Sequence, residues 1–217
     1  MKKGLTELIF ILDRSGSMSG LGSDTIGGYN AMLEKQKKEP GEAVITTVLF
    51  DDKYELLHDR INIRGIEPIT EKEYYVRGTT ALLDAVGRTI GKIGNVQKHT
   101  AEDERAENVM FVITTDGMEN ASREYSYEKI RWMIEHQKSK YGWEFIFLGA
   151  NIDAIDTAGR FGIGQDRAVN YNADSEGTLL NYEVISETVS NLRACREISE
   201  DWKDRIEEDF KKRGGRR

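Results

Sequence analysis

The sequence predicts an α/β fold with a doubly wound, mainly parallel central sheet and one antiparallel edge strand. Two observations lead to this prediction. Short continuous apolar runs, typical of strands buried on both faces, alternate with longer stretches whose apolar residues recur at helical spacing. One pair of strand-like segments is separated only by a short polar turn, as in a hairpin. Alternating strands and helices favour parallel connections, and the hairpin supplies the antiparallel edge.

The first half of the chain is expected to contain a strand, a helix and the hairpin. Leu8–Leu12 is a continuous apolar run and is therefore predicted to be a buried strand. The helix that follows is expected to be capped by Asp24 and to end before Pro40. Val44–Phe50 and Tyr54–Leu57 flank the polar turn of the hairpin.

Strands and helices continue to alternate in the second half. A helix is predicted from Ala81, because apolar residues recur from there three or four positions apart. Val109–Ile113 and Phe145–Leu148 are two further buried strands, and the helix between them is capped by Ser126. The remaining short elements are a helix at Ala154–Arg160 and an edge strand at Ala168–Tyr171.

Residues 177–212 are predicted to form one long amphipathic helix that packs against the sheet, followed by a frayed basic tail. The residues of its packing stripe are spaced three or four apart: Leu192, Cys195, Ser199, Trp202 and Ile206. No stretch rich in Gly, Ser or Pro has the character of an interdomain linker. Residues 1–217 are therefore predicted to form a single domain.

Composition and charge exclude several classes of function. The formal net charge of −7 argues against a general affinity for nucleic acid or an anionic membrane, both of which need a positive field. No apolar run approaches the roughly 20 residues that span a bilayer, and Leu8–Leu12 is too short for the core of a signal peptide. The single cysteine and three histidines rule out a disulfide framework and a Cys/His zinc cluster. We expect a cytoplasmic protein.

Hydroxyl and carboxylate side chains gather at three predicted strand-to-helix junctions. They are Asp13, Ser15 and Ser17 after the first strand, Thr80 before a helix, and Asp116 after a later strand. In a doubly wound sheet such loops converge beyond the carboxyl ends of the strands, where ligands bind. Alternate residues of an extended loop point to the same side, so Asp13, Ser15 and Ser17 can face one ligand.

The donor set selects the kind of ligand. Oxygen atoms without imidazole or thiolate favour hard cations, chiefly Mg²⁺, with Mn²⁺ and Ca²⁺ as alternatives. Two carboxylates around one dication leave no excess negative charge at the metal. An Asp or Glu carboxylate from a partner protein can therefore fill an open coordination position. We expect a docking site rather than an enzyme, because no His or Lys is placed as a general base.

The motif Asp13-x-Ser15-x-Ser17, a distant threonine and a later Thr-Asp-Gly resemble the metal-ion-dependent adhesion site of von Willebrand factor type A domains. The resemblance runs from about Leu5 to Tyr171 and implies a Rossmann-like fold. The chain looks like the stand-alone intracellular members of this family in microbes and their viruses.

The resemblance also implies roles for the site residues. Ser15, Ser17 and Thr80 would supply hydroxyl ligands, while Asp13 and Asp116 would bind the metal directly or through water. Thr80 is preferred to Thr79 as the threonine ligand, because Thr80 keeps the family-like Thr-x-Leu-x-x-Ala pattern at the start of the helix.

Other interpretations stay open from the sequence alone. A metal-dependent phosphohydrolase is one, since some begin with a strand ending in Asp; those enzymes carry a second acid two residues later, where this chain has Ser15. A scaffold that keeps the fold without metal is another. Ser15 and Ser17 are also common turn and helix-cap residues. Asp51 and Asp52 are expected to be hairpin residues, not ligands.

Overall fold

A six-stranded sheet forms the centre of the molecule in the computed structural model, which describes residues 1–214. The strand order is β3-β2-β1-β4-β5-β6, and only the β2–β3 pair is antiparallel. The strands are β1 (Lys2–Asp13), β2 (Glu42–Phe50), β3 (Tyr54–Asn62), β4 (Ala106–Thr115), β5 (Glu144–Gly149) and β6 (Ala168–Asn170). The predicted fold class is confirmed, with β3 as the antiparallel edge strand.

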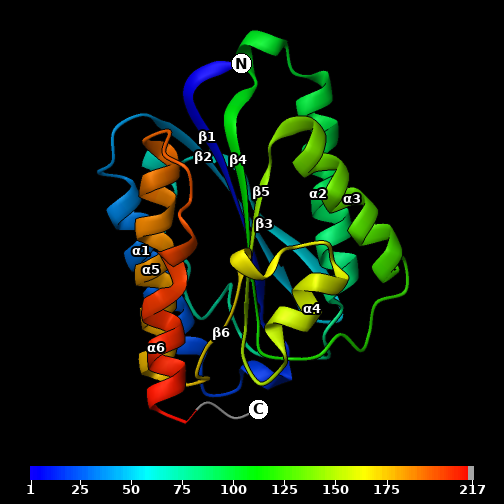
Figure 1. Cartoon of the computed structure of the whole chain (residues 1–217), viewed down its shortest axis with the longest axis vertical. Helices are drawn as coiled ribbons and strands as arrows, with labels where there is room; N and C mark the ends of the chain where they lie inside the picture. The colour runs from blue at the N-terminus through cyan, green and yellow to red at the C-terminus, as the bar shows by residue number, and fades with distance from the viewer. Residues whose placement is uncertain (215–217) are drawn as a thin grey trace.

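Helices cover both faces of the sheet. Figure 1 shows α1, α5 and α6 on one side and α2, α3 and α4 on the other. Their bounds are α1 (Gly22–Gln36), α2 (Leu82–His99), α3 (Tyr127–Tyr141), α4 (Ala154–Arg160), α5 (Ser175–Arg193) and α6 (Asp204–Lys212). No helix within the described residues has the length and apolar character needed to cross a bilayer.

The two-sided cover explains why the inner strands contain continuous apolar runs. Along β1, Leu8, Phe10 and Leu12 pack into the core beneath α1 and α5. The alternate residues Ile9 and Ile11 pack into the core beneath α2 and α3. Each face therefore buries its own half of the strand.

The strand order reverses between β1 and β4, because β2 and β3 lie on one side of this pair and β5 and β6 on the other. In doubly wound sheets, ligands bind at the carboxyl ends of the two strands where the order reverses. In the β1–β4 pair, Leu12 lies opposite Thr114. Asp13 and Thr115, one residue further along each strand, therefore end side by side. The loop after β1 begins with a short 3₁₀ turn, Gly16–Met18, before α1 starts.

One predicted helix cap is confirmed and one is wrong. Ser126 caps α3, and its side chain accepts a hydrogen bond from the Lys129 backbone N–H. Asp24 does not cap α1, because the 3₁₀ turn runs almost directly into the helix and the backbone N–H of Thr25 already bonds to Leu21. Asp24 lies in the first turn instead, where a negative charge is favourable.

The single long helix predicted for residues 177–212 is wrong, because this segment contains two helices. α5 ends at Arg193, and Cys195 adopts the left-handed conformation (φ 55°). The backbone N–H of Arg196 then turns back to the carbonyl of Asn191. α6 folds back onto α5, and Arg205 pairs with Glu183 and Glu187. Leu192 of α5 and Ile206 of α6 are buried as predicted, but Cys195 and Ser199 of the predicted stripe lie at the break and are exposed.

The basic end of the chain is ordered further than expected. Lys211 and Lys212 belong to α6, and Arg213 pairs with Asp174 and Asp209. The predicted fraying is therefore wrong for these residues. The rest of the predicted tail, residues 215–217, lies outside the described residues.

Candidate metal centre

The loop after β1 brings its three candidate ligands together. Asp13 Oδ1 accepts a hydrogen bond of 2.7 Å from the backbone N–H of Ser15. The hydroxyl oxygens of Ser15 and Ser17 lie 3.0 Å apart. The backbone N–H of Gly16 donates to the carbonyl of Gly78 at 3.1 Å, and a Cβ at Gly16 would lie only 3.3 Å from that oxygen. Glycine thus lets the two loops meet.

Thr80 reaches this loop from the segment that precedes α2. Its hydroxyl donates to Ser15 Oγ at 2.9 Å, and the residue is buried. Thr79 is exposed to solvent. The structure therefore brings Thr80, and not Thr79, to the serine hydroxyls.

Asp116 and its neighbours close the site from the end of β4. Thr115 Oγ1 donates to Asp13 Oδ2 at 2.6 Å. A Cβ on Gly117 would lie 2.7 Å from Ser17 Oγ and 3.0 Å from Thr80 Oγ1, so the bare glycine backbone packs directly on these hydroxyls. Asp116 is 3% exposed and accepts a hydrogen bond from the Asn151 side chain. All the candidate residues thus converge at one edge of the sheet.

The loop after Gly117 is fastened to the start of α2. Glu119 accepts a hydrogen bond from the backbone N–H of Leu83, one of the N–H groups that have no partner inside the helix. Asn120 binds Thr80 twice, since its side chain accepts from the Thr80 N–H and its own N–H donates to the Thr80 carbonyl. This arrangement fixes Thr80 relative to Asp116.

Arg14, in the middle of the serine motif, is fully buried and turned away from the site. Its guanidinium donates to Asp51 at 2.9 Å and to Glu55 at 2.7 Å. Asp51 also accepts from Arg77 at 2.7 Å. Asp51 is thus a hairpin residue, as predicted, but it also anchors the site loop, which we did not anticipate. The sequence alone carries no signal for this pair, because the pair depends on the β1–β2 register, which sets Asp13 level with Phe50 and so Arg14 beside Asp51.

Asp13 and Asp116 are buried without an opposite charge. Because Arg14 pairs with Asp51 and Glu55, neither site carboxylate has a cationic side chain at ion-pair distance within residues 1–214. Burial raises the pKa of Asp13. Burial and, to a smaller extent, the charge of Asp13 raise the pKa of Asp116 to about 6. A cation bound between these two carboxylates would compensate for the solvation that they lose on burial.

The donor chemistry fits a hard divalent cation. Three hydroxyls and two carboxylates converge, and oxygen donors are what Mg²⁺, Mn²⁺ and Ca²⁺ take. In the part of the chain that the structure describes, no group of three or more His, Cys, Asp or Glu side chains is gathered for a metal. A metal bound between Asp13 and Asp116 would therefore need hydroxyl oxygens to complete its coordination, and this set of ligands stays a prediction.

Comparison with known proteins gives structural matches only. No protein-family model and no curated protein matches the sequence. The mussel byssus proximal thread matrix protein 1, solved with a zinc-occupied MIDAS motif, matches with a TM-score of 0.58 at 12% identity, covering 85% of this chain and 46% of that one. This chain thus spans about half of the mussel protein.

Two further solved structures extend the comparison. Manganese-loaded TRAP protein of Plasmodium vivax matches with a TM-score of 0.59 at 18% identity, covering 83% of this chain and 72% of that one. The vWF domain of the type V pili tip protein Mfa5 from Porphyromonas gingivalis matches with a TM-score of 0.58 at 9% identity, covering 85% of this chain and 94% of that one. At these identities the likeness concerns the fold.

Proposed function

We propose that this chain, which has a von Willebrand factor A-like fold, is a module that binds a partner protein through a divalent cation. The observation that carries the proposal is the pair of buried carboxylates, Asp13 and Asp116, set among hydroxyls without an opposite charge. Solved structures of similar fold hold zinc or manganese, which supports a divalent cation.

Each residue of the centre has a distinct part in this proposal. Ser15, Ser17 and Thr80 would offer hydroxyl oxygens to the cation. Asp13 and Asp116 would bind it directly or through water and balance its charge. A bound cation supplies a Lewis-acidic coordination position that an Asp or Glu carboxylate of the partner can occupy. Mg²⁺ is the cation we propose, with Mn²⁺ and Ca²⁺ as alternatives.

The surface around the centre favours a partner in which an apolar residue lies next to the Asp or Glu that reaches the cation. Met118 follows Asp116 by two residues and is 74% exposed. A partner segment with an acidic residue next to an apolar one fits this rim.

A binding role is favoured over hydrolysis by the placement of the remaining side chains. Ser15 occupies the position where the phosphohydrolases considered above carry a second acid, and it bonds to Thr80. The histidines are engaged elsewhere: His58 with Thr47, His99 with a backbone carbonyl and His136 in a stack with Trp132. None of these histidines is hydrogen-bonded to Asp13 or Asp116, where a general base for hydrolysis would be needed.

The proposal is tested by titrating Mg²⁺ and Mn²⁺ into the chain by calorimetry. Wild type should bind one cation, and Asp116→Asn, which keeps the side-chain shape, should lose that binding. Asp103→Asn is the matched control, because Asp103 is an exposed carboxylate in the short turn before β4, at the opposite end of the strand. Wild type that binds neither metal, or Asp116→Asn that binds as well as wild type, would contradict the proposal.

Partner binding needs a second arm of the same test. Proteins retained by the immobilised chain in Mg²⁺ should be released by EDTA, and Ser17→Ala should retain fewer of them. Retention that is unchanged in EDTA would contradict a docking role for the cation, even where the calorimetry shows that the cation binds.

A further inference from the structure

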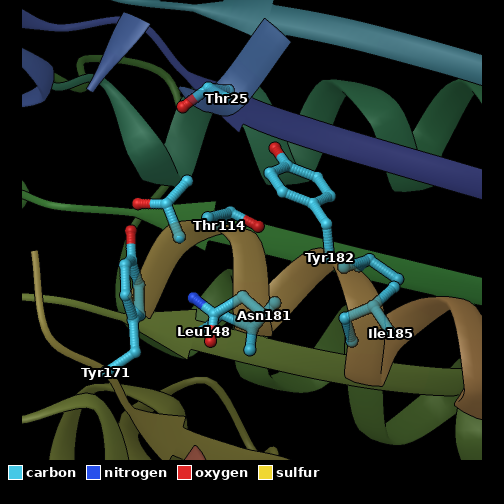
Figure 2. Close-up of a pocket in the computed structure, with 9 residues that line it drawn as sticks. Thr25, Thr114, Leu148, Tyr171, Asn181, Tyr182 and Ile185 are labelled. Atoms are coloured by element: carbon cyan, nitrogen blue, oxygen red, sulfur yellow. The ribbon is translucent and has the colours of Figure 1, made fainter. Parts of the chain in front are cut away.

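A small enclosed cavity lies between the sheet and the α1–α5 layer (Figure 2). Its walls come from β4, β5, α1, α5 and the residue after β6: Thr25, Val112, Thr114, Leu148, Tyr171, Thr178, Asn181, Tyr182 and Ile185. None of these side chains carries a formal charge at neutral pH.

The cavity is distinct from the metal centre, although it lies near the same end of β4. Thr115 bonds to Asp13 at the metal centre. Thr114, one residue earlier, points to the opposite face and lines the cavity. Figure 2 shows Asn181 and Tyr182 extending from α5, with the Tyr182 ring directed towards Thr25.

Unpartnered polar atoms gather around the cavity. Within the described residues, five of the seven buried side-chain nitrogen and oxygen atoms without a hydrogen-bond partner belong to its walls. They are Thr25 Oγ1, Thr178 Oγ1, both amide atoms of Asn181, and the Tyr182 hydroxyl. All four residues are more than nine-tenths buried. Buried polar groups are nearly always hydrogen-bonded, so this concentration indicates a common partner.

The size of the cavity limits that partner to a very small molecule. About 10 Å³ is open to the centre of a water molecule, close to the minimum of roughly 10–15 Å³ that one buried water needs. Sites for organic ligands enclose on the order of 300–1,000 Å³. An organic ligand therefore does not fit.

The mixture of donors and acceptors distinguishes water from a cation. The Asn181 Nδ2 group can only donate hydrogen bonds, so it cannot ligate a cation. The Asn181 Oδ1 atom can only accept them, and the hydroxyls of Thr25 and Tyr182 do either. Water both donates and accepts, and a buried water typically makes about three such bonds.

We propose that this cavity is a binding site for one internal water molecule, held by Asn181 and by hydroxyls of the cavity wall. The water supplies about three of the hydrogen bonds that these side chains do not make with one another. The inference does not depend on the proposed metal function.

The test is ¹⁷O magnetic relaxation dispersion of water, which detects water molecules held inside a protein for longer than it tumbles. Asn181→Leu has a similar volume and removes two of the unpartnered atoms, so it should lose one long-lived water relative to wild type. Thr188→Val is the matched control. Thr188 is also a buried threonine of α5, but its hydroxyl already bonds to the Val184 carbonyl at 2.9 Å. This control should keep the wild-type number.

An equal number of long-lived waters in wild type and a folded Asn181→Leu would overturn the proposal. A crystal structure of the wild type gives an answer even where the variant does not fold. It should show water density within hydrogen-bond distance of Asn181 and of at least one hydroxyl in the cavity wall. A cavity without density, or one with an ion at metal-ligand distances, would equally overturn the proposal.

Discussion

Asp13 and Arg14 are adjacent in sequence, and both carry buried charges, but the two charges are compensated in different ways. Arg14 is paired inside the chain with Asp51 and Glu55. Asp13 has only hydroxyl and N–H partners in the described residues and lies near a second buried carboxylate, Asp116. The Arg14 network is complete without a ligand and holds the loop in place. In the function proposed above, a cation from solution would compensate the Asp13 side.

The largest expected effect comes from breaking the internally paired region. Arg14→Met keeps the length of the side chain but leaves the fully buried Asp51 without one of its cations. Removing one partner of a buried ion pair typically costs about 3–5 kcal/mol. Urea denaturation should show a loss of unfolding free energy on this scale. A loss below about 1 kcal/mol would mean that the network is not an anchor.

The second effect concerns Asp13 and Asp116, the buried carboxylates without a cationic partner. Removing a charge here should not destabilise the protein. Asp116→Asn in metal-free buffer should be no less stable than wild type, because burial disfavours the charged carboxylate it removes. Saturating Mg²⁺ should stabilise wild type only, by about 2.7 kcal/mol at one hundred times the dissociation constant. Thermal denaturation with and without Mg²⁺ measures both effects. Equal stabilisation of the two proteins would contradict the distinction between the regions.

The third effect is a pH dependence of the paired region. Burial alone would raise the pKa of Asp51, but hydrogen bonds from Arg77, the Lys53 N–H and Arg14 together lower it below its usual value of 3.8. A lowered folded-state pKa contributes stability above pH 3.8 that is lost as the pH falls further. The unfolding free energy of wild type should therefore decline more steeply below pH 4 than that of Asp51→Asn. Parallel declines would show that Asp51 titrates as an ordinary carboxyl.

The smallest effect is expected at an ion pair that belongs to neither region. Arg88 and Glu124 pair on the surface, and their side chains are 42% and 51% exposed. Exposed pairs contribute little because water and salt screen them. The unfolding free energy of Arg88→Gln should be indistinguishable from that of wild type. A loss approaching that of Arg14→Met would show that burial does not separate the two kinds of pair.

The fold was predictable because its information is local. The apolar runs and helical spacings need no knowledge of distant contacts, and connection rules leave only a small number of topologies for alternating strands and helices. The two-helix C-terminus was not predictable in this way. The break depends on Cys195 in the left-handed conformation and on α6 docking against α5, whereas the apolar spacing continues through it.

The candidate site was predictable for a related reason, and its surroundings were not. Asp13, Ser15 and Ser17 form a short motif, and the ends of parallel strands must meet at one edge of the sheet. The Arg14–Asp51 pair depends on strand register, and the cavity at Asn181 depends on side-chain packing between α5 and the sheet. The exposure of Trp132 on α3, 58%, likewise depends on how that helix packs. Its helix buries the opposite side, including Ile130 and Ile134.

The most direct test of the central claim is a crystal structure of the wild type soaked in Mn²⁺, with the metal located by its anomalous scattering. The account predicts one strong peak at the carboxyl end of β1, about 2.0–2.3 Å from the hydroxyl oxygens of Ser15, Ser17 and Thr80. A fully soaked crystal with no peak there, or with its strongest peak at other side chains, would contradict it.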